Sequence, residues 1–283
     1  MEVGVFFTAG EGATDIAEVA RAAEALGFGS LWVGEHVVLP VEYEKVYPAD
    51  PSGEPPEYAG LLSSPVVALA RAAAVTTTLR VGTGVCLLPL HEPISFAKDI
   101  ATLDADSGGR FLFGVGAGWM REETEIMGGD FDRRWRQIRD QVAAMKTLWT
   151  EKEAAHDGEY VRFPAVRMHP KPATQPHPPV LLGGASPHIF DRVAAWGEGW
   201  IPGVASVDEM RAGLPKLDAA LEARGRDRSE VTTVAFGFPG CLLSRAEIDD
   251  LGALGVDHAT IWLDDRGPEV IDELERVAKA TLG

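Results

Sequence analysis

The sequence predicts one (β/α)8 barrel that spans residues 1–283, and three observations support this fold class. Eight apolar, strand-like segments alternate with segments of helical periodicity, at about 35 residues per unit. Glycine, histidine and acidic residues gather where the predicted strands end, and that end carries the chemistry of such barrels. No low-complexity linker divides the chain. A doubly wound parallel sheet is the alternative, and the count of eight favours the barrel.

The predicted strands are short runs rich in branched apolar and aromatic residues, mostly bounded by glycine or proline. They are, in order, 2–9, 29–35, the segment between Arg80 and Pro89, 110–115, 179–183, 199–204, 231–238 and 258–264. Two insertions interrupt the rhythm, after the second and the fourth strands. Residues 37–62 form a long Pro- and Gly-rich loop of the kind often kept for function, and residues 156–175 suggest a small hairpin.

The predicted helices are placed by their start and stop signals. Thr14 is the expected N-cap of the first helix, which Gly27 stops, and Pro93 opens the third helix, which ends at 108–109. A helical stretch is predicted over 63–77, an apolar stripe marks a helix from Trp135 to Trp149, and the last helix is predicted over 268–282. Ser186 and Pro187 are the expected N-cap and first residue of another helix. Capping boxes are expected at Ser206 with Glu209 and at Ser244 with Glu247.

Composition excludes several classes of function. A net charge of −17 argues against nucleic acid or an anionic membrane as a general partner, because the field of the protein repels phosphates. No apolar run is long enough to span a membrane and no secretory signal opens the chain, so we expect a cytoplasmic protein. Cys86 and Cys241 form no metal-binding pattern, and we expect free buried thiols and no metal. HExxH, Walker A and GxSxG motifs are absent.

Glu35 and His36 end the second strand at the expected catalytic rim. A histidine there can exchange a proton with a reacting group near neutral pH. The alternative is a rim histidine beside a surface acid, and the position favours the functional interpretation.

Glycines mark the ends of the third, fourth and fifth strands. The run 82–85 indicates a bulge into the barrel mouth or merely a bent strand, and its spacing does not separate the two. The run 114–119 is not a dinucleotide fingerprint, because its third glycine comes one residue early and no ribose-binding acid follows. Trp119 is equally consistent with a pocket wall or a core side chain.

Two further features could meet an anion. The run 183–186 before a predicted helix offers backbone N–H groups for a phosphate, with a tight turn as the alternative. Arg133, Arg134, Arg136 and Arg139 are either a solvated helix face or a dock for an acidic cofactor tail.

Four stretches together resemble the luciferase-like monooxygenase superfamily of flavin and deazaflavin oxidoreductases. They are ALGFGSLWVGEH (25–36), LRVGTGVCLLPLHEPISFAKDIATLDADSGGRFLFGVGAGWMREE (79–123), LWT…HDGEYVRF (148–163) and PKPATQPHPPVLLGGASP…AAWGEGWIP (170–202). The stretches TGVCLLP and GGASP look most like the branch of the family that uses coenzyme F420, and FMN is the alternative cofactor. Beyond residue 202 the chain is similar to the family only in pattern.

The resemblance implies a barrel that forms a homodimer, with the cofactor ring against the third strand, a non-proline cis peptide at Gly84–Val85, a phosphate at residues 183–186 and a catalytic histidine at His36. The expected cofactor-binding residues are Gly82, Thr83, Gly84, Val85, Gly116, Ala117, Gly118, Gly183, Gly184, Ala185 and Ser186. Trp119 is the expected substrate contact. Pro40 and Trp119 replace a Trp and an acid that the sugar-phosphate dehydrogenases of this branch carry, so that activity is not expected.

The resemblance thus implies hydride transfer between F420 and a small enone, imine or carbonyl compound. His36 would supply or remove the proton, with Glu35 tuning it. The alternatives are an FMN-dependent monooxygenase that uses reduced flavin and O2, and a flavin-binding barrel without catalysis.

Overall fold

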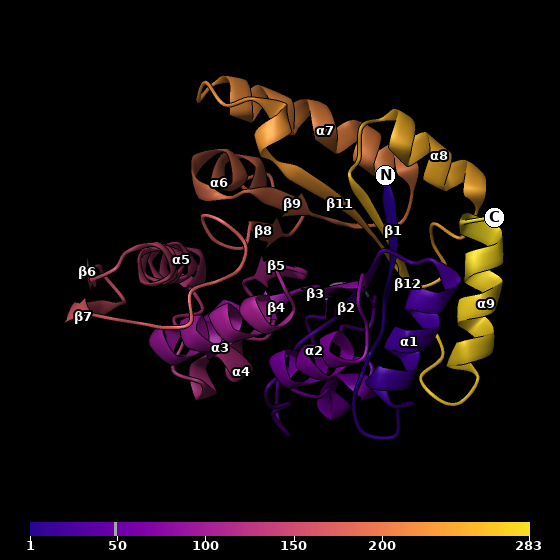
Figure 1. The fold of residues 1–283 in the computed structure, drawn as a ribbon, viewed down its shortest axis with the longest axis horizontal. Helices are drawn as coiled ribbons and strands as arrows, with labels where there is room; N and C mark the ends of the chain where they lie inside the picture. The colour runs from indigo at the N-terminus through magenta and orange to yellow at the C-terminus, as the bar shows by residue number, and fades with distance from the viewer. Residues whose placement is uncertain (48–49) are drawn as a thin grey trace.

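The computed structural model describes residues 1–47 and 50–283 (Figure 1). Its barrel strands are β1 Glu2–Phe6, β2 Ser30–Val33, β3 Arg80–Thr83, β4 Cys86–Leu87, β5 Phe111–Gly116, β8 Val180–Gly183, β9 Gly199–Ile201, β10 Gly203–Val204, β11 Thr232–Gly237 and β12 His258–Trp262. The α-helices are α1 Ile16–Leu26, α2 Pro65–Ala74, α3 Pro93–Asp106, α4 Arg121–Ile126, α5 Arg134–Thr150, α6 Ile189–Trp196, α7 Val207–Glu222, α8 Arg245–Ala253 and α9 Val270–Thr281. Short 3-10 turns are η1 Glu57–Leu61, η2 Leu88–Leu90 and η3 Arg228–Glu230.

The strands close into a parallel barrel. Around the ring they follow the order β1, β2, β3, β5, β8, β9, β11 and β12, and β12 pairs with β1. Two of the eight positions are split, because β4 follows β3 against β5 and β10 follows β9 against β11. Helices surround the strands, and the C-terminus lies at the edge of the molecule next to α9 (Figure 1). The predicted (β/α)8 barrel is confirmed, and closure of the ring rules out a doubly wound sheet.

Side chains fill the barrel, so it is a packed core and not a pore. The interior cluster consists of Phe6, Trp32, Leu112, Leu181, Ile201, Val234 and Phe236. Glycines of the third strand position make room for two of these rings. A Cβ at Gly82 would meet the Trp32 ring at 2.5 Å, and a Cβ at Gly84 would meet the Phe236 ring at 2.5 Å. These glycines therefore admit the aromatic side chains of the barrel itself, which we did not expect from the sequence.

Two of the predicted helix caps are confirmed. Gly27 ends α1 in the left-handed conformation, with φ of 93° and its N–H bonded to carbonyls of the last turn. Ser244 and Glu247 form the reciprocal capping box before α8, in which each side chain accepts a hydrogen bond from the backbone N–H of the other residue.

Three other caps differ from prediction. Asp15, and not Thr14, caps α1 by accepting from Ala17 N at 2.8 Å, because the Thr14 hydroxyl donates to Gly267 O instead. Helix α6 begins at Ile189 with His188 as its N-cap, so Ser186 and Pro187 stay in the preceding turn. The Ser206 side chain makes no capping bond, since Glu209 accepts from Ala205 N.

Both insertions are present. The second is an antiparallel hairpin of β6 Ala154–Asp157 and β7 Arg162–Val166, which projects at the edge of the molecule (Figure 1). The first insertion is described over residues 37–47 and 50–62, and it reaches α4, where Glu44 N donates to Glu122. These described parts lie by the C-terminal ends of the strands, where we expect the site.

Cys86 is free and buried, whereas Cys241 is free and partly exposed, so the second thiol is less enclosed than expected. Within residues 1–47 and 50–283, none of the helices combines the length and apolar content needed to cross a membrane.

Candidate active site

A cleft of about 570 Å³ opens at the C-terminal ends of the barrel strands. Its volume lies within the usual range for pockets that bind cofactors. Nine of the residues expected to bind the cofactor line this one cleft. They are Gly84, Val85, Gly116, Ala117, Gly118, Gly183, Gly184, Ala185 and Ser186. The structure thus brings together residues that lie up to about a hundred positions apart in the sequence.

Val85 lies at the centre of the cleft, directly after the cis peptide bond predicted at Gly84–Val85. Its two methyl groups face the ends of β5 and β8. A Cβ at Gly116 would meet Val85 Cγ2 at 2.3 Å, and a Cβ at Gly183 would meet Cγ1 at 2.7 Å. The absence of side chains at these two glycines therefore seats Val85, which forms part of the floor of the cleft.

Two expected cofactor contacts, Gly82 and Thr83, do not line the cleft. Gly82 faces the Trp32 ring inside the barrel. Thr83 is fully buried, and its hydroxyl donates to Gly114 O at 2.7 Å. These two residues support the strand below the site, because alternate residues of a strand point to opposite faces.

The end of the cleft at residues 183–186 carries positive charge. Arg134 lines the cleft with its guanidinium over the Phe131 ring, and its Nε is buried without a hydrogen-bond partner among the described residues. Arg192 lies over the Trp135 ring at 4.4 Å and approaches Ser186 Oγ. Burial lowers the pKa of both guanidinium groups, and neither has a carboxylate within 4.0 Å in the described structure. An anionic group at this end would satisfy them.

The other arginines of the predicted cluster do not line the cleft. Arg136, for example, pairs with Glu159 of the hairpin region at 2.8 Å, and both side chains are largely exposed. The cluster is therefore divided between one residue that faces the cleft and others on the solvated face of α5.

A second, smaller cavity of about 170 Å³ adjoins the cleft. The two share Gly84, Val85, Leu87, Trp119 and Trp262, so the Val85 backbone and the two indole rings form a common wall. The rest of the lining includes the aromatic rings of Phe6, Tyr47 and Tyr58, and His36 is also part of it. Trp119 is thus a pocket wall, with its ring 5.5 Å from the His36 ring.

His36 is held by a carboxylate that the sequence did not single out. Glu123 Oε2 lies 2.7 Å from His36 Nδ1, while Glu123 Oε1 accepts from Val37 N and Val38 N. The Glu123 side chain is only 2% exposed. An accepting carboxylate places a proton on Nδ1, so Nε2 is the nitrogen that gains or loses a proton. Nε2 has no hydrogen-bond partner among the described residues.

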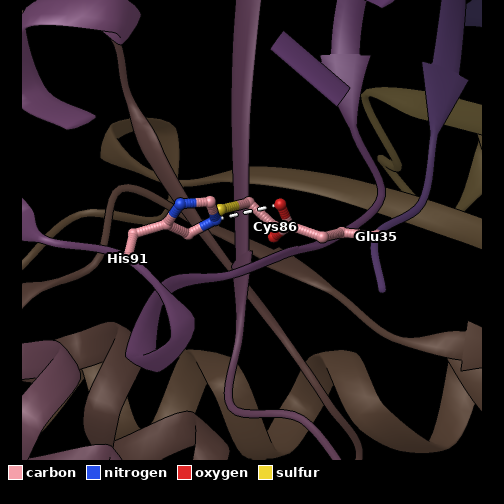
Figure 2. A group of neighbouring side chains, drawn as sticks. All are labelled: Glu35, Cys86 and His91. Atoms are coloured by element: carbon pink, nitrogen blue, oxygen red, sulfur yellow. Dashed lines mark hydrogen bonds and ion pairs between the residues drawn. The ribbon is translucent and has the colours of Figure 1, made fainter. Parts of the chain in front are cut away.

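Glu35, which the sequence-based interpretation has tuning His36, forms its hydrogen bonds with other groups. Its Oε2 accepts from Leu87 N at 2.6 Å and its Oε1 lies 2.9 Å from His91 Nε2 (Figure 2). Residues along an extended chain alternate in direction, so consecutive positions 35 and 36 face different surroundings. Glu35 thus holds the backbone of Leu87, which follows the cis bond and Cys86.

Glu35, Cys86 and His91 also offer three donor atoms within 4.8 Å of one another (Figure 2). Both carboxylate oxygens already accept hydrogen bonds, and burial raises the pKa of the Cys86 thiol well above its usual value. A metal ion would need a thiolate and a free carboxylate. The donor set is therefore already satisfied as a hydrogen-bonded cluster.

A sequence model of luciferase-like monooxygenases matches residues 1–271. The chain belongs to the luciferase-like monooxygenase family. An uncharacterized protein of Mycobacterium tuberculosis is 38% identical over 258 residues, which cover 83% of this chain and 90% of that protein. The FMNH2-dependent dimethylsulfone monooxygenase of Pseudomonas putida is 29% identical over 137 residues, or 47% of this chain and 38% of the enzyme.

The fold is shared with solved structures of the same architecture. The coenzyme F420-dependent tetrahydromethanopterin reductase of Methanopyrus kandleri superimposes with a TM-score of 0.77 at 16% identity, covering 100% of this chain and 99% of that one. Luciferase-like proteins similar to this chain thus include both F420-dependent and FMN-dependent enzymes.

Several residues of this luciferase-like site escaped the sequence analysis. Glu123 lies within the quoted stretch 79–123, but neighbouring Glu122 and Glu125 carry the same charge, and no spacing rule tells which one turns inward. Trp262, Tyr47 and Tyr58 come from the end of the eighth strand and from the aperiodic loop 37–62. Only the folded arrangement brings them together, since their contacts are far apart in sequence.

Proposed function

We propose that the protein is a coenzyme F420-dependent oxidoreductase that transfers hydride between the deazaflavin and a small enone, imine or carbonyl compound. One observation carries this proposal: two cavities meet across Val85, with the positive end of the cleft on one side and His36 on the other. Because the two cavities share lining residues, a cofactor in the cleft and a substrate in the smaller cavity would lie next to each other. Such adjacency is what a direct transfer between two bound molecules requires.

The residues of the cleft fit the cofactor. The backbone of residues 183–186 and the guanidinium groups of Arg134 and Arg192, neither of which has a carboxylate partner in the described structure, would hold its phosphate. Val85 and Gly116 would lie against its ring. The bound deazaflavin supplies or accepts a hydride, and the protein supplies position and electrostatics.

His36 would exchange the accompanying proton at Nε2. In the reducing direction a carbonyl oxygen gains negative charge, and a protonated imidazole is a suitable donor to it. Glu123 would stabilise the imidazolium through Nδ1 and keep the ring oriented towards the smaller cavity. The indole rings of Trp119 and Trp262 would exclude water from this exchange.

The alternative is an FMN-dependent monooxygenase that uses reduced flavin and O2. The likeness to the dimethylsulfone monooxygenase favours it, and the anion-binding end of the cleft would suit the FMN phosphate equally well. The His36–Glu123 pair favours the deazaflavin enzyme, because it provides a proton in the smaller cavity, where the substrate would bind. The homodimer implied by the resemblance and the cytoplasmic location expected from the sequence stay predictions.

Equilibrium titration with oxidised and reduced F420, and separately with FMN and anaerobic reduced FMN, tests the proposal. We expect F420 to bind at micromolar concentration or below and FMN to bind more weakly. Arg134→Gln should weaken F420 binding about tenfold, through loss of a charge-assisted hydrogen bond. Arg136→Gln, on the same helix but paired with Glu159, is the matched control and should leave binding unchanged.

The opposite result would identify the alternative. Tight FMN binding, O2-dependent product formation and no F420 binding would replace the deazaflavin enzyme by a monooxygenase. Binding of a cofactor without turnover of any enone, imine or carbonyl compound would favour a binding protein.

A further inference from the structure

We propose that the smaller cavity binds one uncharged, planar, single-ring carbonyl compound, with its oxygen directed to His36 Nε2. This inference rests on the proposed function and narrows its substrate class. It is carried by three features of the described lining, namely its volume, its aromatic side chains and its lack of a lysine or arginine.

The volume limits the ligand to about one six-membered ring. The cavity measures about 170 Å³. An apolar cavity of about 150 Å³ in another protein holds one benzene molecule. A second fused ring would require the walls to move, and these walls include buried Ala59 and the shared indole rings.

The walls suit a flat ring. The Tyr47 and Trp119 rings are 5.2 Å apart, those of Tyr58 and Trp262 are 6.2 Å apart, and Phe6 contacts Trp262 at 4.3 Å between centroids. Aromatic side chains on several sides offer faces and edges to a conjugated ring. The ring of a planar substrate would therefore be enclosed while its polar atom reaches the rim.

The charges of the lining exclude an anion. No lysine or arginine is among the described residues that line the cavity, and the Glu35 carboxylate is engaged by Leu87 N and His91. Burial, above all, raises the pKa of the Tyr47 and Tyr58 hydroxyls, so both stay neutral. The charge of a protonated His36 is already balanced by Glu123, so a carboxylate or phosphate on the substrate would lie buried without a counter-charge of its own.

Aromatic walls also attract cations, so a cyclic iminium is the competing ligand. His36 decides between them. An iminium carbon that accepts a hydride becomes a neutral amine and needs no proton, whereas a reduced carbonyl oxygen does. The free Nε2 of a histidine backed by Glu123 is suited to the carbonyl compound.

The test is a titration of the purified protein followed by tryptophan fluorescence, because Trp119 and Trp262 both line the cavity. The probes are cyclohex-2-enone, its 3-carboxylate, the cation N-methylpyridinium and the bicyclic ketone 1-tetralone. Each is measured without cofactor and with saturating oxidised F420. We expect saturable binding of cyclohex-2-enone and at least tenfold weaker binding of the other three.

Two variants connect the binding to this cavity. Ala59→Leu should fill it and weaken cyclohex-2-enone binding at least tenfold, while leaving F420 affinity unchanged. Tyr58→Leu removes one aromatic wall and should weaken binding severalfold, whereas Tyr43→Leu, at a tyrosine whose hydroxyl contacts Glu54 elsewhere in the same loop, should not. Equal binding of the carboxylate, the cation or the bicyclic ketone would overturn the inference, as would enone binding that Ala59→Leu leaves intact. Loss of F420 binding alone would instead count against the proposed function, since the fluorescence titration also runs without cofactor.

Discussion

The His36–Glu123 and His91–Glu35 pairs are built alike but face different surroundings. In each, a carboxylate lies within 3 Å of a ring nitrogen, at 2.7 and 2.9 Å, and also accepts a backbone N–H. The side chains of the two histidines are 11% and 19% exposed, so exposure does not single out His36. The useful difference is which nitrogen is bound and what the other one faces.

His36 is bound through Nδ1 and lines the small cavity beside the cleft. His91 is bound through Nε2 to Glu35 (Figure 2). It stacks on Phe96 at 3.8 Å between centroids and lies outside that cavity. The same chemical pair can therefore exchange a proton with a substrate in one place and fix backbone in the other. Position relative to the cavities, more than the identity of the groups, assigns the roles.

Removing the imidazole of the first pair should have the largest effect on turnover. His36→Asn is expected to lower kcat by about 10²–10⁴, because general acid–base catalysis typically contributes that much. The free energy of unfolding should change by less than about 1 kcal/mol, as Asn retains a donor for Glu123. Steady-state kinetics and thermal unfolding measure both. His156→Asn, in a similar pair remote from the cavities, is the control, and His36→Asn with near-normal kcat would contradict the role.

Breaking the second pair should instead affect folding. Glu35→Ala leaves Leu87 N buried without an acceptor and removes the partner of His91. We expect a loss of about 3 kcal/mol or more in the free energy of unfolding, the usual cost of removing one member of a buried pair. Denaturant unfolding measures it, with kcat of the folded enzyme within tenfold of normal. A stable Glu35→Ala protein without turnover would restore Glu35 to the catalytic group.

Glu123 should act through His36, as a positioning residue. Glu123→Gln is expected to lower kcat about tenfold to a hundredfold with little change in KM, because an amide neither stabilises imidazolium nor fixes the same tautomer. The pH dependence of kcat should also shift, whereas a purely structural role would leave the profile of the remaining activity unchanged. Glu122→Gln, on the same helix and bonded to Glu44 N, is the matched control.

The sequence predicted the elements of this site better than their contacts. Eight strands, the two insertions and the ends at which glycines gather follow from local periodicity and turn chemistry, which act over a few residues. The run 183–186 and the residues Gly84, Val85 and Gly116, at three of these strand ends, line one cleft.

The partners of His36 and Glu35 could not be predicted in the same way. Glu35 adjoins His36 in the sequence, yet the carboxylate that binds His36 is 87 residues away. Gly82 was expected to face a ligand, but it faces Trp32. A glycine that makes room for a side chain inside a closed barrel and a glycine that lets a cofactor approach look the same in the sequence. Which side chains meet across the barrel is decided when the sheet closes, and local sequence patterns do not encode that arrangement.

The third carboxylate–histidine pair should give the smallest effect, and one that depends on pH. Asp140 binds His156 Nε2 at 2.7 Å and accepts from Tyr160 N and Val161 N, which attaches the hairpin to α5. Burial alone would raise the pKa of Asp140, but these hydrogen bonds outweigh it and lower the pKa below the ordinary 3.8. The stabilisation is therefore complete above pH 3.8 and is lost as the pH falls through the lowered value.

Asp140→Asn should accordingly reduce the free energy of unfolding at pH 7 by up to about 1 kcal/mol, since solvent near this hairpin screens the charge. The difference from the unsubstituted protein should stay constant from pH 7 to pH 5 and shrink below pH 3.8. Urea unfolding across this range measures it, with kcat at pH 7 unchanged because the pair lies outside both cavities. A penalty that grew with acidity would mean that the neutral acid, and not the carboxylate, holds the hairpin. A fall in kcat would show that a carboxylate–histidine pair need not face the cavities to affect turnover.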